Sequence, residues 1–232
     1  MALAYVVVTL DGAHLFIDSN KLTEPSVSEH LSTGGIVLHP YESIEEFVIE
    51  QAHLGKVLVD PTQLNWRLYG AIQTCSNGKD HSTLIEVASP ISLLKSVKNS
   101  AELAGIRASH VRDGAALTAF LCWLEGAVNA EGSSVTEYDV ATTIETFRKR
   151  AGKHMGPSFD TIAGFAANGA IIHYKPEKAT AATLRTGDGA MFLLDSGGQY
   201  LDGTTDVTRT LHFGTPSDRE KMCYTLVLQV TS

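Results

Sequence analysis

The sequence predicts an α/β protein in two parts, and three changes of pattern along the chain indicate this division. Residues 1–92 alternate short strands with helices, which is typical of a small α/β domain. Beyond Pro90, two long helical stretches follow from Leu93 onward. Short strands return after about Gly156, and a last helix follows them. We therefore predict one domain over residues 1–92 and a second over residues 93–232.

In the first part, a strand, a turn and a second strand open the chain. Residues 5–10 are rich in β-branched side chains and end at an Asp-Gly turn, and residues 13–17 form the second strand. Residues 56–60 are predicted to form a buried strand, and residues 61–72 a helix that Pro61 opens. Residues 81–87 are predicted to form another strand. No glycine-rich phosphate loop follows these strands, so we expect no nucleotide site.

Helices dominate the beginning of the second part. Residues 93–105 and 108–128 are predicted to form two helices. A third helix begins at Thr136, because Thr136 and Asp139 have the spacing of a capping box. Its apolar residues recur at helical spacing on one face: Val140, Ile144 and Phe147.

The end of the chain returns to strands and then to a helix. Residues 190–194 form a short apolar run, and apolar and polar residues alternate over 206–213, which predicts a half-buried strand with one polar face. A last helix begins at a Ser217–Glu220 capping box. Its apolar face has no following segment in this sequence to cover it, and we expect the sequence to be part of a longer one. That face is formed by Met222, Leu226, Val227 and Val230.

Composition excludes several classes of function. An apolar content of 44% and a charged content of 19% are those of an ordinary globular protein. The net charge of −8 argues against nucleic acid or anionic membrane as a partner. No run approaches the roughly 20 apolar residues that a membrane span requires. Cys75, Cys122 and Cys223 lie far apart, which argues against a disulfide framework and favours a reducing cytosol.

Two aspartates are the candidate metal ligands. Asp195 ends an apolar strand, and Asp206 lies on the polar face of the next strand, after a glycine-rich reversal. Two carboxylates at a dry sheet surface repel each other unless they are protonated or bridged by a cation. Oxygen ligands of this kind suit Mn²⁺ or Mg²⁺. The alternative is a surface turn rich in Asp, Gly and Thr that forms hydrogen bonds with its own backbone.

Two histidines are further candidates. His173 follows an apolar Ala-Ile-Ile run, which predicts that it points from a sheet into a cavity or the core. It is then either a catalytic residue or a core histidine whose ring bonds backbone carbonyls. His212 shares the alternating face of Asp206 but is the weaker candidate, since histidines at strand ends are common on surfaces. No Ser or Cys lies in a GxSxG elbow, which argues against a serine hydrolase.

Four ordered motifs carry a resemblance to a known family. They are FDTI (159–162), NGAIIHY (168–174), LDSGGQY (194–200) and DGTTDVTRT (202–210). In this order the set resembles the pita-bread metallopeptidases, and most closely the eukaryotic cytosolic Xaa-Pro aminopeptidases. The resemblance implies that residues 1–92 are the non-catalytic middle domain of a three-domain enzyme truncated at both ends, a small α/β domain like the creatinase N-terminal domain. Residues 93–232 would form the first half of an α+β pita-bread catalytic domain.

The resemblance also implies roles for the candidate residues. Asp195 and Asp206 match two aspartate ligands of a centre of two divalent metal ions, with Mn²⁺ the expected metal and Asp206 bridging the pair. His173 matches a histidine that contacts substrate at the scissile bond and is not a ligand. The remaining ligands, one His and two Glu, belong to the second half of the fold, beyond Ser232. This chain by itself is therefore expected to be inactive.

The implied enzyme is a cytoplasmic homodimer that removes the N-terminal residue from peptides with proline at position two. We weigh two alternatives: a metal-free pita-bread relative that acts as a binding module, and a prolidase or creatinase-like hydrolase. Both Asp195 and Asp206 are present, which favours descent from an enzyme. The residues at 199–200 (Gln-Tyr) and 202–205 (Asp-Gly-Thr-Thr) resemble the aminopeptidase more than the prolidase.

Overall fold

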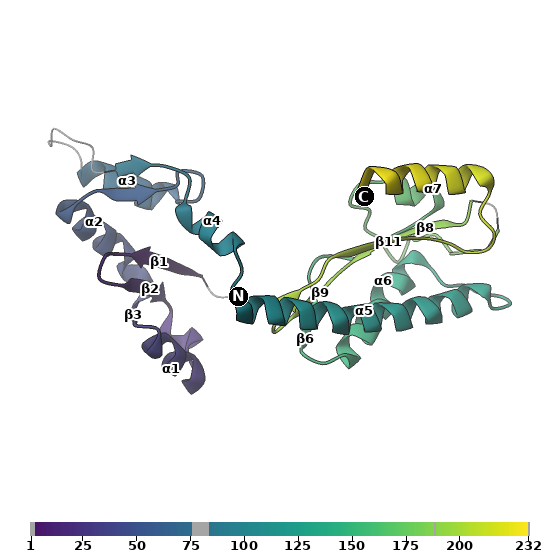
Figure 1. Cartoon of the computed structure of the whole chain (residues 1–232), viewed down its shortest axis with the longest axis horizontal. Coiled ribbons are helices and arrows are strands. Elements are labelled where there is room, and N and C mark those ends of the chain that lie inside the picture. The colour runs from purple at the N-terminus through teal and green to yellow at the C-terminus, as the bar shows by residue number, and fades with distance from the viewer. Residues whose placement is uncertain (1–2, 76–83, 188, 232) are drawn as a thin grey trace. The chain divides into compact units, whose positions relative to one another are not determined.

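A computed structural model describes residues 3–75, 84–187 and 189–231 of the chain. The chain divides into two compact units, residues 1–97 and 98–232, which are described separately (Figure 1). The predicted domain limit between residues 92 and 93 falls within α4 (Pro90–Ser96), and it stays a prediction. Among the described residues, every helix is too short or too polar to cross a membrane.

The first unit opens with the predicted hairpin. β1 (Ala4–Val8) pairs antiparallel with β2 (Ala13–Ile17), and β2 pairs in parallel with β3 (Ile36–His39). The 3₁₀ turn η1 (Ser19–Lys21) and the helix α1 (Pro25–Thr33) connect the two parallel strands.

The rest of this unit alternates helices and strands, as predicted. The 3₁₀ turn η2 (Tyr41–Ser43) leads into α2, and β4 and β5 pair in parallel. Residues 81–83 of the predicted strand over 81–87 lie outside the described residues. The helices and strands are α2 (Ile44–Leu54), β4 (Val57–Val59), α3 (Trp66–Cys75) and β5 (Leu84–Glu86). Their core contains Phe16, Ile44, Val48, Ala52, Val59, Leu68 and Ile72.

The prediction of a helix from Pro61 is wrong at its beginning. The Asp60 carboxylate accepts hydrogen bonds from the backbone and hydroxyl of Thr62, and it also accepts one from the Ser89 backbone. These bonds hold the chain in a turn after β4, and helix α3 begins at Trp66. Asn65 then accepts from the Leu68 backbone and acts as the cap.

The helices predicted over 93–105 and 108–128 are divided differently in the structure: residues 93–96 belong to α4, and the second unit begins with one long helix. α5 runs from Ser100 to Asn129, with Asn99 and Glu102 forming a capping box at its start. The predicted break near Gly105 is wrong because this glycine serves packing. A Cβ at Gly105 would collide with the backbone carbonyl of Asp202, so the helix continues where the glycine lets another segment approach.

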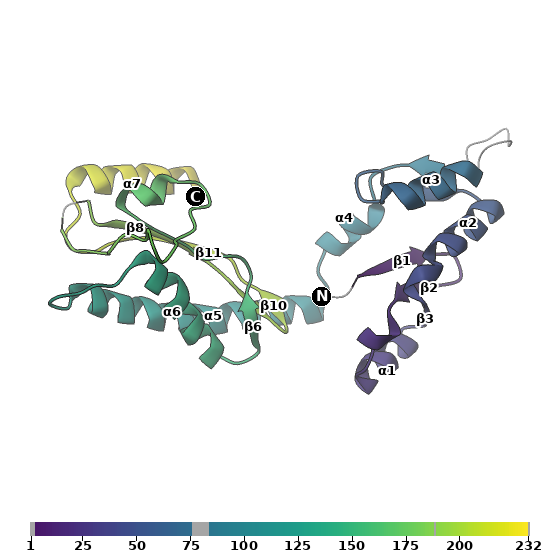
Figure 2. The same cartoon turned by 180° about the vertical axis from the view of Figure 1, so that it is seen from behind.

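Two three-stranded sheets and two further helices complete the second unit (Figures 1 and 2). One sheet has the antiparallel order β11-β8-β7, and the other has the order β10-β9-β6. The helices are α6 (Glu137–Arg150) and α7 (Asp218–Thr231). The strands are β6 (His154–Pro157), β7 (Ile162–Phe165), β8 (Met191–Ser196), β9 (Gly198–Tyr200), β10 (Gly203–Thr204) and β11 (Val207–His212).

Helices cover both faces of the β11-β8-β7 sheet. α5 and α6 lie on one side and α7 on the other (Figure 1). The core lies between helices α5 and α6 and the sheet, with Phe120, Leu124, Val140, Ile144, Phe192 and Leu194 fully buried. Both predicted capping boxes are confirmed, at Thr136 for α6 and at Ser217 for α7. The predicted apolar residues of α7 are exposed, from 55% at Met222 to 86% at Val230.

Candidate functional site

Asp195 lies near the end of β8 on the sheet face that points away from α5 and α6. Phe192 and Leu194 are fully buried in the core below the sheet. Side chains alternate along a strand, so Asp195 points to the opposite face. Its Oδ1 atom is buried and has no hydrogen-bond partner among the described residues. A buried, unpaired carboxylate oxygen is costly and indicates a missing cation or donor.

The pairing of β8 with β11 places Asp206 on the same face. Thr208 lies directly opposite Asp195, and Val207 lies opposite Ser196. Asp206 precedes β11 by one residue and is exposed. Because alternate residues share a face, Asp206 follows Thr208 to the side of Asp195, as its diagonal neighbour. Diagonal neighbours across an antiparallel pair lie about 7–8 Å apart, a span that metal ions and side-chain adjustment can bridge.

The chain reversal between the two aspartates requires a glycine. A Cβ at Gly197 would collide with the Thr205 carbonyl oxygen and with the Ser158 hydroxyl. The Thr205 hydroxyl in turn accepts a hydrogen bond of 2.9 Å from the Gly198 backbone. These contacts close the reversal and bring the residue before β11 back beside β8.

A buried ion pair holds the end of β8 from below. Arg148 of α6 donates to Asp113 of α5 over 2.8 Å and to the Ser196 hydroxyl over 3.0 Å. The Tyr200 hydroxyl donates to the same Asp113 oxygen over 2.9 Å, and burial together with this bond raises the pKa of Tyr200. Ser196 follows Asp195, so the network fixes the strand beside the first aspartate.

His173 does not lie where the sequence predicted. The residues before it form the 3₁₀ turn η3 (Ala166–Ala170), and His173 itself is exposed in a turn. The expectation of a strand that directs it into the core is therefore wrong, and so is the core-histidine alternative. Ile171 and Ile172, which suggested a strand, are themselves exposed. His173 has a φ of 55°, a left-handed conformation that is uncommon for residues other than glycine.

The segment that leads to His173 packs on the sheet face of Asp195. A Cβ at Gly169 would lie 3.6 Å from Leu193 Cβ. Leu193 and Asp195 are two residues apart on β8 and point to the same side. The fold therefore brings η3 to the sheet face of Asp195, and His173 follows η3 by three residues. No direct contact between His173 and either aspartate is present among the described residues.

Glu137 is a residue that the sequence did not single out. It is fully buried at the start of α6, and its carboxylate accepts hydrogen bonds from the segment around His173. One donor is the Tyr174 hydroxyl, and burial and this bond raise the pKa of Tyr174 to about 12. A glutamate in the first turn of a helix is common, so its position alone gave no signal.

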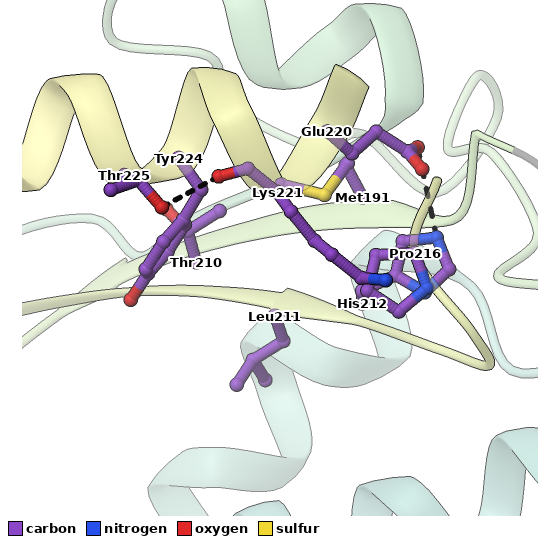
Figure 3. A pocket seen from close by; sticks show the side chains of 9 residues that line it. All are labelled: Met191, Thr210, Leu211, His212, Pro216, Glu220, Lys221, Tyr224 and Thr225. Carbon is purple, nitrogen blue, oxygen red and sulfur yellow. Dashed lines mark hydrogen bonds and ion pairs between the residues drawn. The ribbon is translucent and has the colours of Figure 1, made fainter. Parts of the chain in front are cut away.

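A cavity of about 220 Å³ lies between α7 and β11 (Figure 3). It contains the weaker candidate His212, whose Nε2 lies 3.6 Å from Glu220 Oε1. Hydrogen bonds from Ser217 lower the pKa of Glu220. The cavity is lined by Met191, Thr210, Leu211, His212, Pro216, Glu220, Lys221, Tyr224 and Thr225. Neither predicted aspartate nor His173 lines it.

The candidate ligand atoms at the β8–β11 face suit a hard divalent cation. They are carboxylate oxygens, one of them buried without a partner. Within the described ranges, no group of three or more His, Cys, Asp or Glu residues is arranged to hold a metal ion. Asp195 and Asp206 therefore form at most part of a ligand set.

Two family models match the chain. Residues 1–102 match the Creatinase/Prolidase N-terminal domain, and residues 104–232 match Metallopeptidase family M24. The chain belongs to metallopeptidase family M24. The predicted fold class is thereby confirmed: a creatinase-type α/β domain precedes the pita-bread domain of family M24.

Named relatives of this M24 chain are Xaa-Pro aminopeptidases, as the resemblance predicted. This chain is 43% identical over 249 residues to Aminopeptidase P2 of Arabidopsis thaliana. The match covers 97% of this chain and 34% of the relative. The chain is also 43% identical over 230 residues to Xaa-Pro aminopeptidase 1 of Dictyostelium discoideum, covering 98% of this chain and 35% of the relative. The chain thus spans about a third of the length of these relatives.

Solved structures give the same family resemblance. The X-prolyl aminopeptidase of Caenorhabditis elegans, described as a cytosolic enzyme with a di-nuclear active site, is 32% identical with a TM-score of 0.77. The match covers 94% of this M24 chain and 35% of that protein. The Xaa-Pro dipeptidase of Bacillus anthracis, 23% identical with a TM-score of 0.71 over 98% of this chain and 59% of that one, shows the fold alone.

Proposed function

We propose that this chain is part of an Xaa-Pro aminopeptidase, which removes the N-terminal residue from peptides with proline at position two. The observation that carries the proposal is the buried, unpaired Oδ1 of Asp195 on β8, with Asp206 directly before the paired strand β11. Relatives that are 43% identical bear this enzyme's name, which supports the substrate class.

Each candidate residue has a distinct part in this proposal. The carboxylates of Asp195 and Asp206 would hold divalent ions as part of a larger ligand set. The bound ions supply Lewis-acid polarisation of the carbonyl before proline. The imidazole of His173 contacts the peptide at that same bond, which suits its exposed position in the turn after η3.

Several finer properties belong to the same proposal. Oxygen ligands support Mn²⁺ as the metal, and the di-nuclear active site of the C. elegans relative supports two ions. That relative is cytosolic, which supports a cytoplasmic location for this protein. The resemblance to the family supports a homodimer. A net charge of −8 supports a partner other than nucleic acid or membrane.

Paired substitutions test these roles in a form of the protein that spans the full length of its relatives. Asp206→Ala should lose bound metal, measured by elemental analysis, together with turnover of an Xaa-Pro tripeptide. His173→Ala should keep the metal while kcat falls about 10²-fold, the effect typical of losing one electrostatic contact in the transition state. Loss of metal from His173→Ala would make this histidine a ligand and contradict the assignment. Unchanged turnover would remove it from the site.

A further inference from the structure

The Glu137 carboxylate accepts hydrogen bonds from four residues of the segment that runs from the end of β7 to residue 182. Its Oε1 accepts from the Phe165 backbone over 2.7 Å and from Asn168 Nδ2 over 3.0 Å. Its Oε2 accepts from the Tyr174 hydroxyl over 2.7 Å and from the Ala182 backbone over 2.8 Å. One fully buried carboxylate therefore contacts both ends and the middle of this segment.

Both oxygens of the Glu137 carboxylate accept hydrogen bonds, which explains how a carboxylate can be buried here. A buried carboxylate is costly unless donors surround it. Each oxygen has at least two donors, and Asn168 Nδ2 also lies 3.2 Å from Oε2. The Glu137 backbone makes a further hydrogen bond to the segment: its N–H donates to the Ala182 carbonyl over 3.0 Å. The energy of these bonds therefore depends on the segment keeping its path.

His173 lies within this segment, between residues that Glu137 anchors. Tyr174, the next residue, donates its hydroxyl to Glu137, and Asn168 donates five residues before His173. Backbone bonds close the turn locally, from Ile171 N to Asn168 O over 3.1 Å and from Tyr174 N to Ile171 O over 3.2 Å. The left-handed φ of His173 is unfavourable by itself and persists only where the surroundings determine it.

We propose that Glu137 is the positioning residue for His173: it fixes the turn that presents the imidazole. The inference rests on the proposed function, since it assigns Glu137 a role through the substrate contact of His173. Glu137 itself lies beneath the segment and touches no reacting atom. Its effect on turnover therefore passes through the position of the histidine.

Glu137→Gln tests the anchor with almost no change of volume. The amide keeps one acceptor oxygen but turns the other into a donor, which then faces the Ala182 N–H or the Tyr174 hydroxyl. Glu145→Gln is the matched control, because Glu145 lies on the same helix and bonds Arg148 instead of the His173 segment. Tyr174→Phe is a milder second variant: it removes the bond that the Tyr174 hydroxyl donates to Glu137 and the one that it accepts from Asn168.

The first measurement is hydrogen exchange of the 232-residue chain. Glu137→Gln should speed exchange of the Phe165 and Ala182 amides about 10-fold or more, because both lose a charged acceptor. Glu145→Gln should leave these two amides unchanged. Equal exchange in wild type and Glu137→Gln would show that the carboxylate does not hold the segment, and it would overturn the proposal without any assay of activity.

The second measurement is a double-mutant cycle on kcat in the form that spans the length of the relatives. Glu137→Gln should lower kcat about 10- to 100-fold with metal content unchanged, the size expected from a displacement of about 1 Å. Tyr174→Phe should lower kcat less. In the Glu137→Gln/His173→Ala double variant, kcat should equal that of His173→Ala, because the anchor acts through that side chain.

The outcomes separate this inference from the proposed function. If the fold-losses of kcat in the two single variants multiply in the double variant, Glu137 acts independently of His173 and the positioning role is wrong. If Glu137→Gln does not fold, Tyr174→Phe provides the same cycle with a smaller effect. If His173→Ala leaves kcat intact, the assigned role of His173 fails and the positioning role fails with it. The exchange data still report whether Glu137 anchors the segment.

Discussion

Arg148 donates from Nε to Asp113 Oδ1 over 2.8 Å, and both side chains are buried within the second unit. The pair joins α6 to α5, and through the Ser196 hydroxyl it also joins both helices to the end of β8. A buried ion pair contributes little net stability compared with apolar residues, but breaking it by removing one partner is costly. The pair therefore makes the strand beside Asp195 depend on both helices.

We expect Asp113→Ala to lower the free energy of unfolding by about 3–5 kcal/mol, because it leaves the buried Arg148 guanidinium with a single carboxylate contact, the longer one of 3.3 Å to Glu145. Urea denaturation followed by circular dichroism measures this loss. Tyr200→Phe removes only one hydrogen bond to Asp113 and should cost about 1.5–3 kcal/mol. An Asp113→Leu/Arg148→Met double variant should be more stable than Asp113→Ala. Equal loss in all three variants would contradict this explanation.

A second prediction concerns the unpaired oxygen of Asp195. Asp195→Asn should raise the free energy of unfolding of the metal-free chain by about 1 kcal/mol or more, since it removes an uncompensated buried charge. Asp202→Asn is the matched control and should destabilise the chain, because Asp202 is paired with Arg112 and Lys153. Thermal unfolding in a chelator compares the two variants. Destabilisation by both would mean that Asp195 has a stabilising partner.

The same variant tests metal binding. Millimolar Mn²⁺ should raise the Tm of the wild-type chain, because a ligand that binds only the folded state stabilises it, and it should leave Asp195→Asn unchanged. Two carboxylates without further ligands bind Mn²⁺ weakly, so dialysis should remove it. Two ions retained per chain after dialysis would show that the 232-residue chain already contains a complete metal site, and the prediction of weak binding would be wrong.

The sequence predicted best the features that depend on neighbouring residues. The capping box at Thr136 needs only Asp139, three residues away, and the hairpin at the start of the chain needs only its Asp-Gly turn. Both are present in the structure. The break predicted near Gly105 failed because that glycine contacts Asp202, which lies 97 residues later in the chain. A glycine kept for packing and one that ends a helix have the same appearance in a sequence.

The candidate site depends on contacts that a single sequence does not contain. The residue types of Asp195 and Asp206 indicated oxygen ligands, but their common face follows from the Thr208–Asp195 register. Hydrogen bonds to Glu137 come from residues 28 to 45 positions away, so helical or strand periodicity could not reveal them. His173 was assigned to a strand environment because an apolar run precedes it, and the exposed turn became visible only in the fold.

A third prediction links the α6 cap to pH. The Thr136 hydroxyl and backbone hydrogen bonds lower the pKa of Asp139 below its usual value of 3.8. A lowered pKa in the folded state stabilises the protein above pH 3.8, and this contribution is lost as the pH falls through the folded-state value. Thr136→Ala should therefore cost about 1 kcal/mol at pH 7, and the difference from wild type should shrink below pH 4.

The control for this prediction is Thr142→Ala on the same helix. The Thr142 hydroxyl donates to the Tyr138 and Asp139 backbone carbonyls and, within the described part of the chain, to no carboxylate. Its effect on stability should not change between pH 7 and pH 3. Denaturation curves for both variants at a series of pH values make the comparison. If the two variants respond alike to acid, Asp139 does not depend on Thr136 as the structure indicates.

The last prediction concerns the reversal that brings the two aspartates together. Gly197→Ala would place a Cβ against the Thr205 carbonyl, which is backbone and cannot rotate away. We expect a loss of about 1–3 kcal/mol from overpacking. Gly114→Ala is the opposite control: no atom lies within 4 Å of its added Cβ in α5, and the substitution should stabilise the helix by about 0.5–1 kcal/mol.

The position of Gly197 also gives this variant an effect on metal binding. Thr205 precedes Asp206, so a shift of the Thr205 carbonyl moves the second aspartate relative to Asp195 on β8. Gly197→Ala should therefore lose the rise in Tm that Mn²⁺ gives the wild-type chain, although both carboxylates remain. A variant that is destabilised yet keeps the full Mn²⁺ response would show that the ion does not require Asp195 and Asp206 to lie on one face at this spacing.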